Sequence, residues 1–252
     1  MPDTVPGTCQ APGSAGGPAC DLIPVQAPRV VPDADPYLPP PDTGLDVVHE
    51  ETGFVVLAKP PGLLSEPGRG ADKRDSLVVR AQARYPGARI VHRLDMMTSG
   101  VMVLALDAAT HANLSAAFRE RRVSKRYEAL VHGPWPADDP RVPREGEIDL
   151  PLIVDWPNRP RQVVCHATGK PSLTHYRALA DGALARVALE PVTGRTHQLR
   201  VHLAALGHPI AGDPFYGRAS DGAARMMLHA CRLEFAHPDS GQALAFRSEV
   251  PF

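Results

Sequence analysis

The chain has 252 residues, of which 43% are hydrophobic and 22% charged, and its formal net charge is −1. This composition is typical of a soluble globular domain and excludes a strongly basic or strongly acidic protein. Because no apolar stretch approaches the roughly 20 residues of a bilayer span, and no signal-peptide pattern opens the chain, we expect a cytoplasmic protein.

The first part of the chain differs from the rest in composition. Residues 1–45 hold 11 of the 28 prolines and five Asp against one Arg. Such a segment cannot bury enough apolar surface to offset the entropy of ordering it. We therefore expect residues 1–40 to form a disordered tail and residues 41–252 to form one folded domain, whose mild basic bias decides nothing by itself.

The folded part shows short apolar runs separated by turn signals, with little helical periodicity. Strands outnumber helices and recur in adjacent pairs, which favours an α+β fold with a mixed, largely antiparallel sheet and flanking helices. In chain order, the patterns predict a hairpin over 45–49 and 53–57, a helix over 76–85, a buried strand over 101–106, a helix carrying Leu114, Phe118 and Arg121, a strand over 127–131, a polar loop over 134–146, paired strands over 173–180 and 184–192, a helix over 199–206 ended by Gly207, and a strand over 227–235.

A polar run at residues 92–100, His-Arg-Leu-Asp-Met-Met-Thr-Ser-Gly, directly precedes the predicted buried strand. Asp95 has His92, Arg93 and two hydroxyl groups nearby, which could keep its carboxylate ionised and directed. The alternative is an Asx-turn that only holds the loop together. The pattern alone does not decide between a reactive and a structural aspartate.

A basic run follows at residues 119–126, with five basic side chains against one acid in eight residues. This density could neutralise several phosphates, and Tyr127 directly beyond it could stack on a base or handle a proton. The alternative is a solvated helix end whose cations complement the helix dipole, with Tyr127 in the core.

Two further segments could carry function. In the run 191–200, Pro-Val-Thr-Gly-Arg-Thr-His-Gln-Leu-Arg, a turn opens a helix that Thr193 or Thr196 could cap, and Arg195 could project into a site. A plain capping turn is the alternative. The run 155–161, Asp-Trp-Pro-Asn-Arg-Pro-Arg, could recognise an unpaired nucleotide or could be a turn anchored by its Trp.

Together and in this order, these motifs resemble the RluA family of pseudouridine synthases. The resemblance is carried by H-R-L-D-x-x-T-S-G at 92–100, K-x-Y at 125–127 and T-G-R-x-H-Q-L-R-V-H at 193–202, and it continues through 207–217 and 228–230. It implies the pseudouridine synthase fold over 41–252, and isomerisation of uridine within RNA without a metal or an organic cofactor. The sequence departs from the larger ribosomal enzymes of the family in that we expect no S4-like domain. The run 155–160 further resembles the branch that modifies position 32 of tRNA and position 746 of 23S rRNA.

The resemblance also implies a role for each matching residue. Asp95 matches the essential aspartate, which either attacks the sugar at C1′ or assists a glycal-type route. Tyr127 matches the tyrosine that lies against the uracil and helps remove the C5 proton, and Arg195 matches the basic residue that pairs with the aspartate. The expected RNA-binding residues are Arg93, which would fill the gap left by the flipped nucleotide, His92, Arg122, Lys125, Arg126, Arg159 and the pocket residue Leu199.

The expected partners are stem-loops of tRNA and 23S rRNA, bound by a monomer. Two alternatives remain open at this stage. One is a synthase of the same family that acts on another rRNA uridine. The other is an RNA-binding or RNA-folding protein that keeps the scaffold without catalysis.

Overall fold

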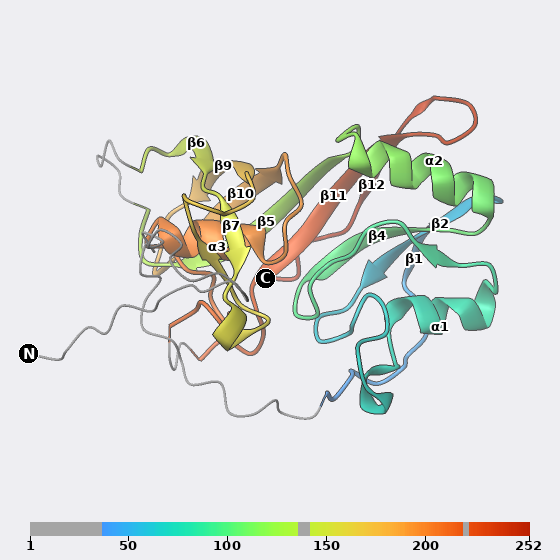
Figure 1. Ribbon diagram of the computed structural model, residues 1–252, viewed down its shortest axis with the longest axis horizontal. Helices are drawn as coiled ribbons and strands as arrows, with labels where there is room; N and C mark the ends of the chain where they lie inside the picture. The colour runs from blue at the N-terminus through green and yellow to red at the C-terminus, as the bar shows by residue number, and fades with distance from the viewer. Residues whose placement is uncertain (1–36, 136–141, 219–221) are drawn as a thin grey trace, which may run out of the picture.

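A computed structural model describes residues 37–135, 142–218 and 222–252 (Figure 1). Within these residues, one mixed sheet runs through the molecule in the order β1-β2-β4-β11-β5-β10-β9-β6, with β3 paired to β4 and β12 paired to β11. The strands are β1 (Val47–Glu50), β2 (Phe54–Lys59), β3 (Arg89–Ile90), β4 (Ser99–Ala105), β5 (Ser124–His132), β6 (Glu145–Asp149), β9 (Leu173–Ala180), β10 (Leu184–Pro191), β11 (Leu228–Ala236) and β12 (Ala243–Arg247).

One half of the sheet is covered on both faces by helices. Every residue of β4 is buried, and its side chains alternate between the two faces. Met102 and Leu104 pack with α1 (Leu77–Arg84), whereas Val101 and Val103 pack with α2 (Ala108–Arg119), so the helices lie on opposite sides of the strand (Figure 1). This explains why β4 is a continuous apolar run in the sequence.

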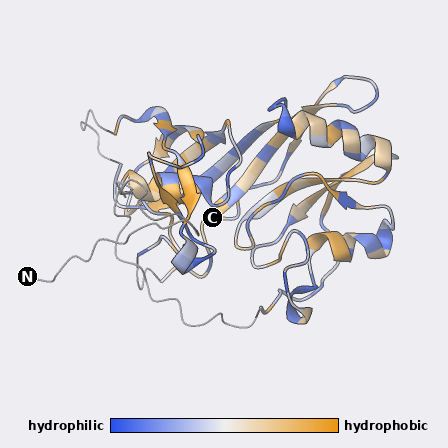
Figure 2. Ribbon diagram, viewed as in Figure 1, coloured by the Kyte–Doolittle hydropathy of each residue, from blue (hydrophilic) through white to orange (hydrophobic). Residues whose placement is uncertain are grey.

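The other half of the sheet is covered on one face by α3 (Gln198–Ala205). Leu199 and Leu203 of this helix share a core with Val187 and Leu189 of β10. The residues of β10 that alternate with them, Arg186, Ala188 and Glu190, point to the other face and are mostly polar, and Figure 2 shows blue and pale orange bands along the long central strands. A small second sheet, β7 (Leu152–Val154) with β8 (Gln162–Val164), packs on α3 through Val201. The short helix η2 (Trp156–Asn158) lies in the loop between these strands, and η1 (Ala71–Lys73) precedes α1.

The two halves join where β11 pairs with β5 on one side and, in parallel, with β4 on the other. Gly100 has a φ of +117°, and a Cβ there would lie 2.2 Å from the carbonyl oxygen of Ala230. Only glycine allows this close approach. The Ser-Gly step that ends the polar run 92–100 therefore fixes that run to the centre of the sheet.

The α+β fold with a mixed, mostly antiparallel sheet confirms the prediction. The hairpin, the strands that form β4, β5, β9, β10 and β11, and all three α-helices lie where the sequence patterns place them, within a few residues. Several details differ. Helix α2 ends at Arg119, because Arg121 adopts a left-handed φ of 58°. Residues 145 and 146, which the predicted loop 134–146 included, belong to β6, and β3, β7, β8 and β12 were not predicted.

Most of the expected tail lies outside the described residues, but its last four residues are described and are held in place. The hydroxyl of Tyr37 accepts a hydrogen bond from the backbone of Leu64 and donates one to the carbonyl of Asp75. Arg80 of α1 donates to the carbonyl of Pro40 at 2.6 Å. Tyr37 and Pro40, which the sequence analysis assigned to the tail, therefore contact the folded domain. Among the described residues, no helix is long and apolar enough to cross a bilayer.

Candidate active site

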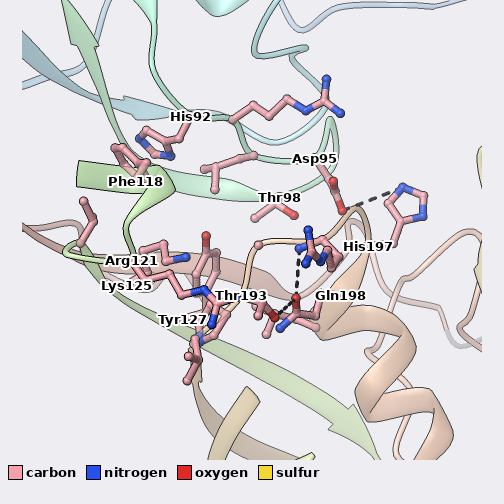
Figure 3. A pocket seen from close by; sticks show the side chains of 18 of the residues that line it. His92, Asp95, Thr98, Phe118, Arg121, Lys125, Tyr127, Thr193, His197 and Gln198 are labelled. Carbon is pink, nitrogen blue, oxygen red and sulfur yellow. Dashed lines mark hydrogen bonds and ion pairs between the residues drawn. The ribbon is translucent and has the colours of Figure 1, made fainter. Parts of the chain in front are cut away.

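A cavity of about 680 Å³ lies where the loop before β4, the start of β5 and the start of α3 meet (Figure 3). Its lining comes from residues 91–98, 115–127 and 191–200, together with Leu228. These are three of the segments that the sequence patterns select. The volume lies in the usual range for small-molecule sites and is sufficient for one nucleoside.

Asp95 lies in a loop whose backbone is fixed on both sides. The amide of Leu94 donates to the hydroxyl of Ser65 at 3.1 Å, and the amide of Thr98 donates to the carbonyl of Asp95 at 3.0 Å. The amide of Gly62 donates to the carbonyl of Met96 at 2.9 Å. The carboxylate of Asp95 points into the cavity and is 28% exposed (Figure 3). It is therefore held in one orientation while it stays accessible.

Arg200 of α3 holds the carboxylate of Asp95. Its Nη1 lies 3.2 Å from Oδ2 of Asp95, while Nε and Nη2 each lie 2.7 Å from the carboxylate of Asp213. Burial alone would raise the pKa of Asp213, but the hydrogen bonds and charge of Arg200 outweigh it and lower this pKa. One buried guanidinium thus connects a structural carboxylate to an accessible one.

The predicted partner of Asp95 was Arg195, and the structure corrects that pairing. Arg195 is exposed at the cavity wall, and its Nε donates to the carbonyl of Pro171 at 3.3 Å. The reason is the geometry of the turn. The left-handed residue His197, with φ 54°, separates Arg195 from the helix, whereas Arg200 lies in the first turn of α3 and faces inward.

Gln198 fixes the turn that carries these residues, a role that the sequence analysis missed. Its Oε1 accepts from the hydroxyl of Thr193 at 2.6 Å and from the amide of Arg195 at 3.0 Å. Its Nε2 donates to the carbonyl of Leu173 and to the hydroxyl of Thr174. No side chain caps α3, so neither threonine has the capping role that was expected.

His197 lies next to Asp95, but its imidazole does not balance the negative charge of the carboxylate. Its Nε2 is 4.0 Å from Oδ2 of Asp95, and its Nδ1 is 2.8 Å from the hydroxyl of Tyr216. Burial, followed by the charge of Arg200, lowers the pKa of His197 to about 4. The imidazole is therefore neutral at pH 7, and Arg200 is the cation that balances Asp95.

Tyr127 comes from β5 and places its hydroxyl inside the cavity, across from Asp95 (Figure 3). Within the part of the chain that the structure describes, this hydroxyl makes no hydrogen bond. Burial, and then the negative charge of Asp95, raise the pKa of Tyr127 well above its ordinary value. The side chain is therefore a neutral phenol at neutral pH, with its proton available to a ligand.

His92 lies in the cavity wall, stacked on Phe118 with ring centroids 4.4 Å apart. Its Nε2 accepts the backbone N–H of Val103 at 3.1 Å. Because a backbone N–H can only donate, Nε2 carries no proton, and the neutral ring must carry its proton on Nδ1. Burial, and then the charge of Lys125, lower the pKa of His92 to about 3.

We therefore expect both His92 and His197 to stay neutral between pH 5 and pH 8. In ¹⁵N-histidine NMR spectra, the His92 ring should keep the shifts of the Nδ1–H tautomer throughout this range. The exposed His175, for which the structure shows no such backbone bond, provides the comparison signal in the same spectra. A titration midpoint of His92 near 6.5 would contradict the assigned tautomer.

The basic run 119–126 does not form one surface. Side chains of β5 alternate, so Lys125 lines the cavity with Tyr127, whereas Arg126 points to the opposite face, beside Glu145 and Glu147. The expected placement of Arg126 at the RNA site is therefore corrected. Of the other cations in the run, Arg122 bonds to Glu120 outside the cavity lining, while Arg119 and Arg121, which the prediction left out, belong to that lining.

Of the remaining predicted residues, Arg93 and Leu199 line the cavity, whereas Arg159 does not. Arg93 lies at the cavity wall, 62% exposed, with Nη1 2.7 Å from Glu66. Leu199 lines the cavity and is buried in the core beneath it. Arg159 is not part of the lining and stacks on Trp156, with its guanidinium 4.1 Å from the ring centre.

Lys59 is a further residue that the sequence analysis did not select. It is 1% exposed, and its Nζ donates to the carbonyls of Pro60, Leu63 and Met96 at 2.7 to 3.0 Å. Burial lowers the pKa of Lys59 to about 7, although the nearby charge of Asp95 opposes this shift. The bond to Met96 ties the residue that follows Asp95 to the end of β2. Lys59 therefore helps to hold the loop of the reactive carboxylate.

No group of three or more His, Cys, Asp or Glu residues in the described ranges could hold a metal ion. The lining of the cavity presents a carboxylate, the guanidinium that balances it, a neutral phenol and a rim of cations. A family model described as RNA pseudouridylate synthase matches residues 53–205, which include all three segments that line the cavity.

The chain belongs to the RluA family of pseudouridine synthases, which are isomerases. It is 48% identical over 221 residues to the "Dual-specificity RNA pseudouridine synthase RluA" of Escherichia coli (strain K12), covering 86% of this chain and 98% of that protein. The protein of the same name from Yersinia pestis is 48% identical over 210 residues, covering 82% and 99%.

Solved structures agree with this assignment. The human protein "RNA Pseudouridylate Synthase Domain Containing 1" matches with a TM-score of 0.68 and 32% identity, over 85% of this chain and 87% of that one. The human protein "RNA Pseudouridylate Synthase Domain Containing 4" matches with a TM-score of 0.63 and 28% identity, over 81% and 88%. The predicted family and the predicted fold are both confirmed.

Proposed function

We propose that this synthase modifies uridine in two kinds of RNA loop, at position 32 of tRNA and at position 746 of 23S rRNA. The names of its relatives, which are called dual-specificity RNA pseudouridine synthases, support two substrates. The observation that carries the catalytic part is the placement of Asp95, held by Arg200, across a cavity of about 680 Å³ from the hydroxyl of Tyr127. That arrangement fits one extruded nucleoside.

The target uridine must leave its base stack before its glycosidic bond can be reached, and a loop uridine costs less to extract than a paired one. Once it is in the cavity, its C1′–N1 bond breaks, the uracil rotates, and a C1′–C5 bond forms. The proton on C5 is then lost and N1 gains one, so the product is an isomer and no co-reactant is needed. Asp95 acts on the sugar, either by attack at C1′ or by removal of a sugar proton in a glycal route.

Arg200 contributes by keeping the carboxylate of Asp95 charged and aimed, since an opposite charge at 3.2 Å favours the ionised form. Tyr127 contributes as a neutral phenol. Its hydroxyl can take the proton from C5 while its own proton passes on toward N1 of the uracil, which avoids a free phenolate and balances the protons of the isomerisation. The raised pKa of Tyr127 supports this relay over direct action as an ionised base.

The rim of the cavity supplies the contacts to RNA in this proposal. The ion pair of Arg93 with Glu66 is exposed and therefore costs less than about 1 kcal/mol to open. Its planar guanidinium is then free to stack in the gap that the flipped nucleotide leaves. Lys125, Arg119 and Arg121 lie where they can contact phosphates, and the Nδ1–H of His92 can donate to the sugar or the base.

The remaining expectations belong to the same proposal. Residues 41–252 act as the catalytic domain, and the protein works as a monomer in the cytoplasm. Arg195 contacts the bound RNA from the cavity wall, because its exposed guanidinium has no carboxylate partner among the described residues. Arg122 and Arg126 are not assigned a contact, because neither belongs to the cavity lining.

Tritium release tests the substrates directly. Anticodon stem-loops and 23S rRNA stem-loops are made with [5-³H]uridine either at the target position alone or at the other positions alone. We expect release from both target-labelled RNAs and none from the RNAs labelled elsewhere. Release from neither target, with modification at another rRNA uridine on chemical mapping, would favour the same-family alternative. RNA binding without any release would favour the non-catalytic alternative.

A further inference from the structure

The loop that joins β7 to β8, residues 155–161, has an exposed aromatic ring at its surface. Trp156 is 49% exposed, although an indole that anchored a turn would be buried. The guanidinium of Arg159 lies 4.1 Å from its ring centre. Because one cation stabilises the ring while much of it stays accessible, Trp156 is presented for stacking and does not hold the loop together.

The loop is instead held by its own backbone and by one contact with the body of the protein. The amide of Asp155 donates to the carbonyl of Arg161 at 2.9 Å, and the amide of Asn158 donates to the carbonyl of Asp155 at 3.0 Å. The amide of Gln162 donates to the hydroxyl of Tyr216 at 2.7 Å. The shape of the loop is therefore formed before any ligand arrives, which reduces the ordering cost of binding.

Arg161 ends the loop and is a buried cation without an ion-pair partner among the described residues. The residue is 6% exposed, and its Nε and Nη1 are closed to solvent and make no hydrogen bond within the described residues. Its third nitrogen, Nη2, is not among the atoms closed to solvent. A buried charge that lacks both an ion-pair partner and hydrogen bonds is unfavourable, so an anionic group that reaches the accessible Nη2 should be stabilised there.

The carboxylates near Arg161 are already engaged. Its guanidinium lies 5.3 Å from the ring centre of Tyr216, and that ring also contacts Arg200 at 5.1 Å. The carboxylates of Asp213 and Asp95 both accept hydrogen bonds from Arg200. Within the described residues, Arg161 thus adds a positive charge beside Tyr216 that no carboxylate pairs with.

This position is close to the reacting carboxylate. The hydroxyl of Tyr216 is 2.8 Å from His197, which in turn lies 4.0 Å from Asp95. Arg161 also contributes to the lowered pKa of His197, which places its charge within electrostatic reach of the catalytic group. The side chains of Tyr216 and His197 would therefore separate a ligand bound to Arg161 from the flipped uridine.

We propose that loop 155–161 is a nucleotide clamp, in which Arg161 binds a backbone phosphate near the target uridine and Trp156 stacks on an unpaired base of the same RNA loop. The proposal rests on the proposed function, because an RNA loop is the ligand that offers a phosphate and an unstacked base together. Arg159 supports the ring from its other side. Arg161 remains unpaired in the free protein because its partner comes with the substrate.

Salt dependence separates the two contacts. We measure the dissociation constant of an anticodon stem-loop at several salt concentrations for the wild-type protein, Arg161→Gln and Trp156→Ala. Arg161→Gln should reduce the slope of log K against log salt by roughly 0.7 to 0.9, the value of one phosphate contact. Trp156→Ala should weaken binding roughly 5- to 150-fold with an unchanged slope, because stacking releases no counterions.

Matched variants control for non-specific effects. Arg177→Gln removes an equally charged residue that is exposed on the opposite face of the sheet, where it pairs with Glu145, and should change neither slope nor affinity. Arg161→Lys should keep most of the slope, and Trp156→Phe should keep most of the affinity. A slope of Arg161→Gln equal to that of the wild type would overturn the phosphate contact.

The melting temperature of Arg161→Gln distinguishes the clamp from a structural role for Arg161. Removal of an unpaired buried charge should leave the melting temperature of Arg161→Gln unchanged or raise it. A clearly lowered melting temperature would overturn the clamp and indicate a structural arginine. The proposed function is tested separately by pseudouridine formation in the wild-type protein. If the wild type forms pseudouridine while Arg161→Gln and Trp156→Ala bind RNA normally, the clamp alone has failed.

Discussion

Asp95→Asn should abolish pseudouridine formation while leaving RNA binding nearly intact. The substitution keeps the shape of the side chain and its contact with Arg200, but it removes the charge that acts on the sugar. We expect a loss of at least ~10⁴-fold in single-turnover rate, as for removal of an essential reacting group. Tritium release from a stem-loop labelled at the target uridine measures the rate, and filter binding measures the affinity.

The control for this variant is Asp107→Asn. Asp107 caps α2 by accepting a hydrogen bond from the amide of Thr110, away from the cavity lining. This variant should change neither stability nor activity appreciably, because Asn caps a helix about as well as Asp does. Turnover by Asp95→Asn within tenfold of the wild type would remove Asp95 from the reaction.

Arg200→Gln should lower both stability and activity, for two different reasons. The variant leaves Asp213 buried without its cation, which should cost about 3–5 kcal/mol of unfolding free energy. It also leaves Asp95 without the charge that holds it, which should reduce the single-turnover rate at least ~10²-fold. Urea unfolding and single-turnover assays with saturating enzyme measure the two effects.

The double variant Arg200→Gln with Asp213→Asn separates these effects. Removing the orphaned carboxylate should restore part of the lost stability, because two neutral amides can hydrogen-bond each other. Activity should not return, since Asp95 still lacks its guanidinium. Recovery of activity along with stability would show that Arg200 serves only the fold, and that the pairing with Asp95 has no catalytic value.

Local patterns sufficed for most strands and helices of this fold. The apolar run of β4 and the alternating runs of β9 and β10 reflect burial that the sequence makes visible. The order of the sheet could not be predicted in this way, because the parallel pairing of β4 with β11 joins residues about 130 positions apart. The resemblance of the motifs, and not their periodicity, led to the cavity that they line.

The partner of Asp95 could not be predicted from the motif alone. Arg195 and Arg200 belong to the same motif, and the choice between them depends on the left-handed backbone of His197, which no composition reveals. Asp213, which orients Arg200, lies 13 residues further along the chain. By contrast, the position of Arg126 could have been predicted, because adjacent residues of a strand point to opposite faces.

Buried polar groups were the hardest features to predict. Lys59 and Arg161 are both basic residues in loop-like contexts, where exposure is the ordinary expectation. Lys59 is buried because three carbonyls converge on it, and Arg161 is buried against Tyr216. Both depend on contacts between distant segments, so only the three-dimensional structure separates them from surface cations.

The central claim is that a flipped uridine occupies the cavity between Asp95 and Tyr127. The most direct measurement is a crystal structure of Asp95→Asn bound to an anticodon stem-loop with an unmodified uridine at position 32. We expect that uridine alone to be extruded, with its C1′ beside residue 95 and its uracil ring against Tyr127. A complex in which this uridine stays stacked in the loop, or in which the RNA lies on another face and leaves the cavity empty, would contradict the account.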